Sequence, residues 1–444
     1  MAARSSLRRA MVLLWAAVAL PSGACSFDTS ANGAGPVGGD DEGDVGDEPD
    51  EICPAEIHAE ISIGGQSPGS EPLSVLLGDT VELSAAGSCS RRGSLRFEWQ
   101  LDEALVATAQ PGLDGETLTV FPAVPGDYEV TLIVSDAEGS AEPITAAGIR
   151  APAWVGAIDQ ADVRDVAASG GRIWMATGDG AFFFDLAEPE AGVQELNPIA
   201  GGFDISTDLS AVYSDGGDLV WFGRKSATSQ VWRLLRAANT IEVVAFPLES
   251  ALVEVRDITA LGAGIMVATR DGVLAAPDNQ TLGAPAPASD VFAATENAAG
   301  GWAGGDDLLR VPDGAPFSPF VDGNNKIRAL AGDAEEVWVG SDDQGIALFD
   351  SADSTAQVFT LEQDGLPSDK IRGLAIDGAD VWAATDKGVA RYKRDRGLWI
   401  TMDEAAGLEG LVDVKGVTVL QVEGRRTIAI AAGGGIATMG LPAD

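Results

Sequence analysis

The sequence predicts an all-β protein, with a small antiparallel sandwich followed by a seven-bladed β-propeller. Two patterns lead to this prediction. Residues 53–151 contain short runs of alternating apolar and polar residues separated by Gly and Pro turns, which is typical of a sandwich. Residues 152–441 repeat one strand pattern seven times, which is typical of propeller blades. Hydrophobic residues make up 45% of the chain and charged residues 22%, so most of the chain can bury a core.

Charge and histidine content exclude several classes of function. The 28 basic and 68 acidic residues give a formal net charge of -40, and such a field repels phosphate groups. We therefore expect no nucleic-acid partner. The chain has 1 histidine, His58, which removes most routes to acid–base catalysis near neutral pH and any multi-histidine metal site. We expect no catalytic residue, no metal and no cofactor.

Residues 1–24 have the pattern of an export signal. Arg4, Arg8 and Arg9 precede an apolar run over 10–20, and small residues at 22–24 precede Cys25. The segment resembles a bacterial lipoprotein signal peptide. This resemblance implies that Cys25 carries a lipid and that the exported protein is anchored to the cell envelope, at the outer membrane, through that lipid alone. Ordinary secretory cleavage nearby, which would leave Cys25 free or paired, is the alternative.

Residues 25–52 are predicted to form an acidic Gly/Asp-rich flexible linker. The segment combines Gly and Pro with a run of acids between Asp40 and Glu51, and it contains no basic residue. Such a composition cannot bury enough apolar surface to offset the entropy lost on ordering. We expect a self-repelling spacer between the membrane and the folded domains.

Residues 53–151 are expected to form one small domain of six or seven strands. The candidate strands lie at 56–63, 80–86, 95–101, 116–121, 127–135 and 142–150. Three motifs, Gly78–Val81, Phe97–Trp99 and Gly126–Val130, resemble those of PKD and other immunoglobulin-like domains. The resemblance implies an immunoglobulin-like/PKD-like β-sandwich.

Two cysteines of this domain are candidates for a disulfide. Cys53 opens the first predicted strand and Cys89 follows the second. The start of one strand lies beside the end of its antiparallel partner, and an exported compartment permits disulfides. We predict a Cys53–Cys89 bond, with two free thiols as the alternative.

The seven repeats of residues 152–441 share one register position per blade. An apolar strand precedes this position in each repeat, and a turn and a third strand follow it. The mean spacing is about 42 residues, which is the period of four-stranded blades. We interpret these residues as core between blades, rather than as a platform for stacking sugars. The register residues are Trp174, Trp221, Met266, Trp302, Trp338, Trp382 and Ala429.

A propeller must close into a ring, and the last repeat supplies only three strands before the chain passes Met439. The segment Trp154–Ile158 stands before the first repeat as an outer strand stands before the next blade. We predict that it becomes the outer strand of the seventh blade and covers its edge.

One repeat resembles the two-component regulator propeller family especially well. Its residues Asp364–Leu374, Val381–Thr385 and Gly388–Val389 are similar to the family pattern G-L-P-S-N-x-V-x-x-I…L-W-I-G-T-x-x-G-L. The resemblance extends over all seven repeats and implies a seven-bladed β-propeller. Members of the family often form the extracytoplasmic sensor part of histidine kinases.

A basic residue recurs at the second place of the innermost strand. In propellers that strand starts at the face where ligands usually bind, so these cations are candidates for a carboxylate or phosphate site. The alternative is internal pairing with Asp165, Asp257 or the turn acids Asp179, Asp271, Asp342 and Asp386. The candidate ligand-binding residues are Arg164, Arg256, Arg328, Arg372 and Lys415.

These observations favour a non-enzymatic, membrane-tethered extracytoplasmic binding or scaffold lipoprotein. Its propeller face would engage a protein or an acidic glycan. The alternative is a propeller-fold lyase or hydrolase acting on envelope or environmental polysaccharide, because one fold supports many activities. The propeller repeats contain neither histidine nor cysteine, which disfavours the enzyme.

Overall fold

The computed structural model confirms the all-β prediction. It describes residues 53, 55–67, 71–92, 94–106, 108–112, 115–157, 162–196, 208–225, 231–237, 240–244, 254–276, 290–311, 315–320, 326–402, 408, 413–422, 425–432 and 434–440. The predicted signal peptide, Cys25 and the acidic linker lie outside these residues. The chain divides into two compact units. One contains the described residues up to Val75 and Asp79–Ala151, and the other contains Leu76–Gly78 and the described residues from Pro152 onward.

The first unit holds two four-stranded sheets and one two-stranded pair. The sheet orders are β3-β10-β9-β6 and β2-β4-β8-β7, and β1 pairs with β5. In β9, side chains alternate between buried and more exposed positions, so that Val130, Leu132 and Val134 enter the core. The elements are β1 Ile57–His58, β2 Ser62–Ile63, β3 Leu73–Ser74, β4 Val81–Ser84, β5 Cys89–Ser90, β6 Arg96–Leu101, α1 Glu103–Val106, β7 Gln110–Pro111, β8 Thr117–Val120, β9 Gly126–Ser135 and β10 Ile144–Ala151.

The predicted disulfide is confirmed. Cys53 is bonded to Cys89, with 5.7 Å between their Cα atoms. Cys89 begins β5 and lies opposite His58 of β1 in an antiparallel register. The bond therefore closes the chain close to where β1 and β5 already pair.

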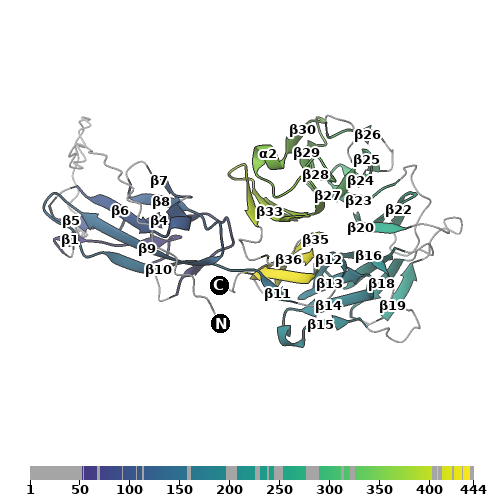
Figure 1. Cartoon of the computed structure of the whole chain (residues 1–444), viewed down its shortest axis with the longest axis horizontal. Helices are drawn as coiled ribbons and strands as arrows, with labels where there is room; N and C mark the ends of the chain where they lie inside the picture. Colours follow the sequence, from purple (N-terminus) through teal and green to yellow (C-terminus); the bar gives the residue numbers. More distant parts are fainter. Residues whose placement is uncertain are drawn as a thin grey trace, which may run out of the picture. The chain divides into compact units, whose positions relative to one another are not determined.

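The second unit contains seven antiparallel sheets, which follow one another around a ring (Figure 1). We number these blades in chain order. Their elements are β12 Val163–Ser169, β13 Arg172–Thr177, β14 Gly180–Asp185, η1 Pro189–Ala191 and β15 Val193–Glu195 in blade one; β16 Leu209–Ser214, β17 Leu219–Arg224, β18 Val231–Leu235 and β19 Thr240–Val244 in blade two; β20 Val255–Leu261, β21 Gly264–Thr269 and β22 Gly272–Ala276 in blade three; and β23 Ala293–Asn297, β24 Gly300–Gly304, β25 Leu308–Val311 and β26 Pro316–Phe317 in blade four.

Blades five to seven follow the same plan. Blade five contains β27 Ile327–Asp333, β28 Glu336–Ser341, β29 Ile346–Asp350 and β30 Ala356–Phe359, and a short helix, α2 Leu361–Asp364, leads to blade six. Blade six contains β31 Ile371–Asp377, β32 Asp380–Thr385, β33 Gly388–Lys393 and β34 Leu398–Met402. Blade seven contains β35 Gly416–Val422, β36 Arg425–Ala432 and β37 Gly435–Gly440.

The ring closes through a strand from the start of the unit, as the sequence predicted. β11, Val155–Ala157, pairs antiparallel with β37 and becomes the outer strand of blade seven. At the centre, the first strand of each blade lies beside the first strand of the next, and β12 lies beside β35. Both the innermost and the outermost parts of blade seven therefore join distant parts of the chain.

The register residues form the core between blades, as predicted. Each is at most 1% exposed, and the seven are Trp174, Trp221, Met266, Trp302, Trp338, Trp382 and Ala429. Trp338, for example, packs against Phe359, Tyr392 and Trp399. This burial rules out the alternative of a sugar-stacking platform at these positions.

Candidate functional site

Four of the five recurring cations of the sequence, those of blades one, three, five and six, lie at β-bulges. In blades one, two, three, five and six the pairing of the first two strands shifts around the second residue of the innermost segment. A bulge leaves one residue outside the regular ladder and redirects its side chain. We call this place the bulge position. Its seven occupants in blade order are Arg164, Ser210, Arg256, Phe292, Arg328, Arg372 and Lys415.

The residue just before each innermost segment forms a second set, which we call the entry position. It is acidic in five blades and lysine in blades five and six. Several of these residues adopt a left-handed backbone with positive φ, a conformation that Asp tolerates better than most residues. The occupants in blade order are Asp162, Asp208, Glu254, Asp290, Lys326, Lys370 and Asp413.

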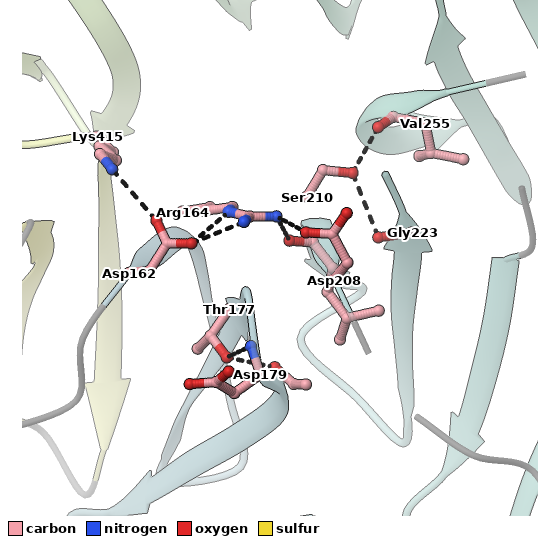
Figure 2. A network of polar contacts seen from close by, with 11 residues as sticks. Asp162, Arg164, Thr177, Asp179, Asp208, Ser210, Gly223, Val255 and Lys415 are labelled. Atoms are coloured by element: carbon pink, nitrogen blue, oxygen red, sulfur yellow. Dashed lines mark hydrogen bonds and ion pairs between the residues drawn. The ribbon is translucent and has the colours of Figure 1, made fainter. Parts of the chain in front are cut away.

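Arg164 links blades one and two through carboxylates at entry positions. Figure 2 shows its guanidinium between Asp162 and Asp208. Nε and Nη2 donate to Asp162 Oδ2 at 2.9 and 2.7 Å, and Nη1 donates to Asp208 Oδ1 at 2.6 Å and to the Leu209 carbonyl at 3.0 Å. Lys415 of blade seven approaches the other oxygen of Asp162 at 3.6 Å. This cluster joins three blades.

The contacts of this cluster shift the pKa values of Asp162 and Arg164. Burial alone would raise the pKa of Asp162, but the hydrogen bonds and charges of Arg164 and Lys415 lower that pKa below its ordinary value. Burial likewise opposes the charge of Arg164, but Asp162 and Asp208 raise its pKa overall. Both partners therefore stay ionised at neutral pH.

The other cations of the bulge position are paired less completely. Arg256 contacts Asp290 at 2.9 Å and Glu254 at 3.8 Å. In the next pair of blades, Arg372 donates to Asp342 Oδ1 at 2.7 Å, and Arg328 lies 3.6 Å from Asp342 Oδ2. The ion pairs at the bulge position thus follow the boundaries between neighbouring blades.

Phe292 occupies the bulge position of blade four and separates two guanidinium groups. The Cζ atoms of Arg256 and Arg328 lie 3.9 and 3.6 Å from the centre of its ring. At these distances each guanidinium must lie over a face of the ring, because the ring's own atoms block an approach in its plane. One face cannot hold both groups, so Phe292 is held between them. Cation–π attraction stabilises this arrangement.

Asp165 and Asp257 were two of the acids named in the pairing alternative, and within the described residues neither forms an ion pair with the cations. Asp165 accepts hydrogen bonds from the backbone N–H groups of Val166, at 2.9 Å, and of Val212 in the next blade, at 2.8 Å. Asp257 binds Ile258 N–H and, in the next blade, Ala294 N–H, both at 2.8 Å. The free edges of the inner strands expose N–H groups that need acceptors, and these carboxylates supply them. They connect neighbouring blades.

Both residues are partly exposed, but protein atoms surround their carboxyl groups closely enough to remove most of the hydration that favours the charged form. Desolvation raises the pKa of Asp165 to about 7, with a further contribution from the charge of Asp257. Desolvation also raises the pKa of Asp257 to about 6, against the lowering effect of its two N–H donors.

The turn acids behave differently from one blade to the next. Asp342 pairs with Arg328 and Arg372, as the pairing hypothesis allowed, and Asp386 lies 4.0 Å from Lys370. Within the described residues, no ion pair involves Asp179 or Asp271. The acids of the entry position were missed, although the sequence shows an acid immediately before the innermost segment in most blades.

Other parts of the described structure offer weaker candidates. A shallow cavity of about 480 Å³ in the first unit is lined by Asp102, Asp127 and Glu129 among others, so its charge disfavours an anionic ligand. His58 lies 3.9 Å from Glu60. Within the described residues, no group of three or more His, Cys, Asp or Glu side chains is placed to hold a metal ion. In the same residues, no helix is long and apolar enough to cross a membrane.

No known protein family matches the chain, and no curated protein matches it. Solved structures do. One is described as the extracellular domain of the hybrid two-component system BT4673 of B. thetaiotaomicron, with 16% identity and a TM-score of 0.50 over 65% of this chain. Another, the extracellular domain of BT3049 of the same organism, has 14% identity and a TM-score of 0.51 over 81% of this chain. The chain spans 39% and 58% of those two proteins, and at these identities the similarity shows the fold alone.

Proposed function

We propose that this protein is a non-enzymatic extracytoplasmic binding or scaffold lipoprotein. A lipid on Cys25 holds it at the cell envelope, at the outer membrane, and residues 26–52 act as the spacer. The end of the propeller where the chain enters the innermost strands, which we call the entry face, engages a protein or an acidic glycan. The sandwich of the first unit acts as a further spacer.

The observation that supports this proposal is the ring of bulge positions. A closed ring brings one such side chain from every blade to the same end of the innermost strands. The strands repeat, but the bulge position varies between arginine, serine, phenylalanine and lysine. A repeated frame with varied polar side chains at one end suits recognition, because the frame fixes the positions of groups that make different contacts.

The proposed location at the cell envelope rests on the sequence and agrees with the fold. Charged, apolar and small residues precede Cys25 in the order of a lipoprotein signal. The repeats resemble the two-component regulator propeller family, and the two similar structures are described as extracellular domains. An exported, envelope-bound protein accounts for all of these features.

The carboxylates of Asp165 and Asp257 do not favour the lyase or hydrolase. Asp165 and Asp257 have the raised pKa values expected of acid–base catalysts. However, each accepts hydrogen bonds from two backbone N–H groups, one of its own strand and one of the next blade. These contacts give them a structural role between blades.

The proposal is tested with the full chain carrying Cys25→Ser, immobilised and exposed to envelope extract and to an array of acidic and neutral glycans. Wild-type side chains at the entry face should retain a protein or an acidic glycan, and Arg328→Ala combined with Arg372→Ala should reduce that retention. Arg150→Ala, which removes an exposed arginine paired with Asp127 in the first unit, is the control. The proposal fails if nothing is retained, or if the entry-face variant retains as much as the control.

A further inference from the structure

Blades five and six differ from the others at the entry position. Five blades carry an acid there, but blades five and six carry Lys326 and Lys370. These two blades are neighbours, and their innermost strands β27 and β31 lie side by side. The acids that balance their cations come instead from the turns at Asp342, Asp343 and Asp386. This part of the entry face therefore presents lysines where the rest presents carboxylates.

The two lysines are only loosely paired. Lys326 Nζ lies 3.6 Å from Asp343, and Lys370 Nζ lies 4.0 Å from Asp386, both beyond hydrogen-bond distance. Their side chains are 43% and 52% exposed, against 20% for Arg164. An exposed ammonium with a distant partner keeps its donors available to a ligand, whereas Arg164 uses its donors within the fold.

Arg328 lies beside these lysines with unused donors. Its contact with Asp342 spans 3.6 Å, while Arg372 holds the same carboxylate at 2.7 Å. It makes no hydrogen bond with the part of the chain that the structure describes, and its Nε is buried without a partner. Its Cζ lies 3.6 Å from the centre of the Phe292 ring. The result is a partly exposed planar fork beside an aromatic ring, and such a fork matches a carboxylate.

Backbone contacts keep these groups together. Asp342 N–H donates to the Lys326 carbonyl at 3.1 Å, and Gly345 N–H donates to the Asp369 carbonyl, one residue before Lys370, at 3.0 Å. The turn of blade five thus joins the two entry segments that carry the lysines. Lys326, Arg328 and Lys370 together form what we call the basic sector.

We propose that the basic sector binds the carboxylate groups of an acidic glycan; this proposal rests on the function proposed above. The net charge of -40 disfavours the more densely charged phosphate polymers. Protein interfaces place aromatic and apolar anchors at their centre. Among the described residues, the exposed large apolar side chains are Val124, Val155 and Leu361, which supplies few such anchors. A polar, carboxylate-bearing sugar chain fits these groups better.

The test titrates the full chain carrying Cys25→Ser with uronic-acid oligomers, and with neutral oligomers of the same length. The protein with the wild-type basic sector should bind the uronic-acid oligomers and not the neutral oligomers. Lys326→Ala, Lys370→Ala and Arg328→Ala should each weaken binding about tenfold or more, the scale of one lost charge-assisted contact. Lys370→Arg should retain most of the affinity. Lys225→Ala, an exposed lysine near the entry position of blade two, should change nothing.

Thermal melts separate binding from folding. Lys326 and Lys370 are exposed and loosely paired, so their alanine variants should melt with the wild type even if Arg328→Ala does not. Equal uronate affinity in the wild type and both lysine variants would overturn the proposal for the basic sector. The same holds if the wild type binds an acidic peptide but does not bind uronate. Failure of the wild type to bind uronate also overturns the basic-sector proposal. In that case, retention of an envelope protein at the entry face would still support the broader proposed function.

Discussion

At the scale of single residues, Arg164 and Arg328 show that one sequence position can serve two purposes. Both are the second residue of an innermost segment. Arg164 has acids before its own segment and before the next one, and it forms hydrogen bonds with both. Arg328 has lysines at those two places, so among the described residues its acidic partner is the turn acid Asp342. The neighbours at the entry position therefore decide whether a bulge arginine is structural or available.

Arg164→Ala is expected to lower the stability of the propeller. The change removes four hydrogen bonds and leaves the carboxylates of Asp162 and Asp208 facing each other. Because these carboxylates are partly exposed, solvent screens them and the loss should be about 1–3 kcal/mol. Denaturant unfolding of the variant beside Lys225→Ala measures it. A midpoint equal to that of the wild type would contradict the structural role.

Asp165 should make the propeller less stable as pH rises from about 4 to about 7. Its pKa is raised from 3.8 to about 7 in the folded chain, so the folded state binds the proton more tightly than the unfolded state. The stability that protonation gives is present at low pH and is lost as pH rises through the folded pKa. Asp257, with a pKa raised to about 6, acts in the same direction.

Asp165→Asn isolates this effect. Asparagine offers one oxygen to the two N–H donors of Val166 and Val212, so the variant loses a contact but carries no charge at this place at any pH. Melting temperatures of both proteins between pH 4 and pH 8 provide the measurement. The stability of the variant relative to the wild type should rise with pH. A constant difference would show that Asp165 does not titrate in this range.

At the scale of elements, the repeated sequence pattern made the blades predictable. The contacts made by loops could not be predicted in this way. The spacing of Trp174, Trp221 and Trp338 follows from packing one large side chain per blade boundary, so the sequence carried that signal seven times. The partners of the cations follow from bulges and left-handed residues at the starts of strands. The sequence repeats an acid at the entry position of five blades, but this recurrence alone does not show which cation each acid contacts. The pairing alternative named Asp165 and Asp257 as possible partners of the cations, because sequence alone did not show that they accept hydrogen bonds from backbone N–H groups of the next blade.

The closing strand β11 should be necessary for a stable propeller. A chain beginning at residue 150 keeps Val155, Gly156 and Ala157 opposite β37, whereas a chain beginning at residue 161 loses that pairing and exposes the edge of blade seven. The shorter chain should therefore melt at a lower temperature and associate more readily. Differential scanning calorimetry and light scattering of the two chains test this. Identical melting temperatures would show that the ring does not depend on this strand.

At the scale of the whole molecule, the charge makes local recognition necessary. A net charge of -40 repels anions at long range, but salt screens distant charges over about 8 Å at physiological ionic strength. An anion that reaches the entry face then responds mainly to the nearest groups, and around blades five and six these include Lys326, Arg328 and Lys370. The same net charge favours solubility and keeps copies of the protein apart.

The proposed membrane tether would act on the whole chain at once. Arg4, Arg8 and Arg9, an apolar run and small residues precede Cys25, and a lipid on this residue would hold the acidic chain against the repulsion of an anionic surface. Cys25→Ala is expected to move the protein from the membrane fraction to the soluble fraction of the envelope, while both folded units remain intact. Fractionation with labelled fatty acid measures location and lipid together, and Cys53→Ala with Cys89→Ala is the control for the loss of cysteine. If Cys25→Ala stays in the membrane fraction as fully as the wild type, the tether lies elsewhere.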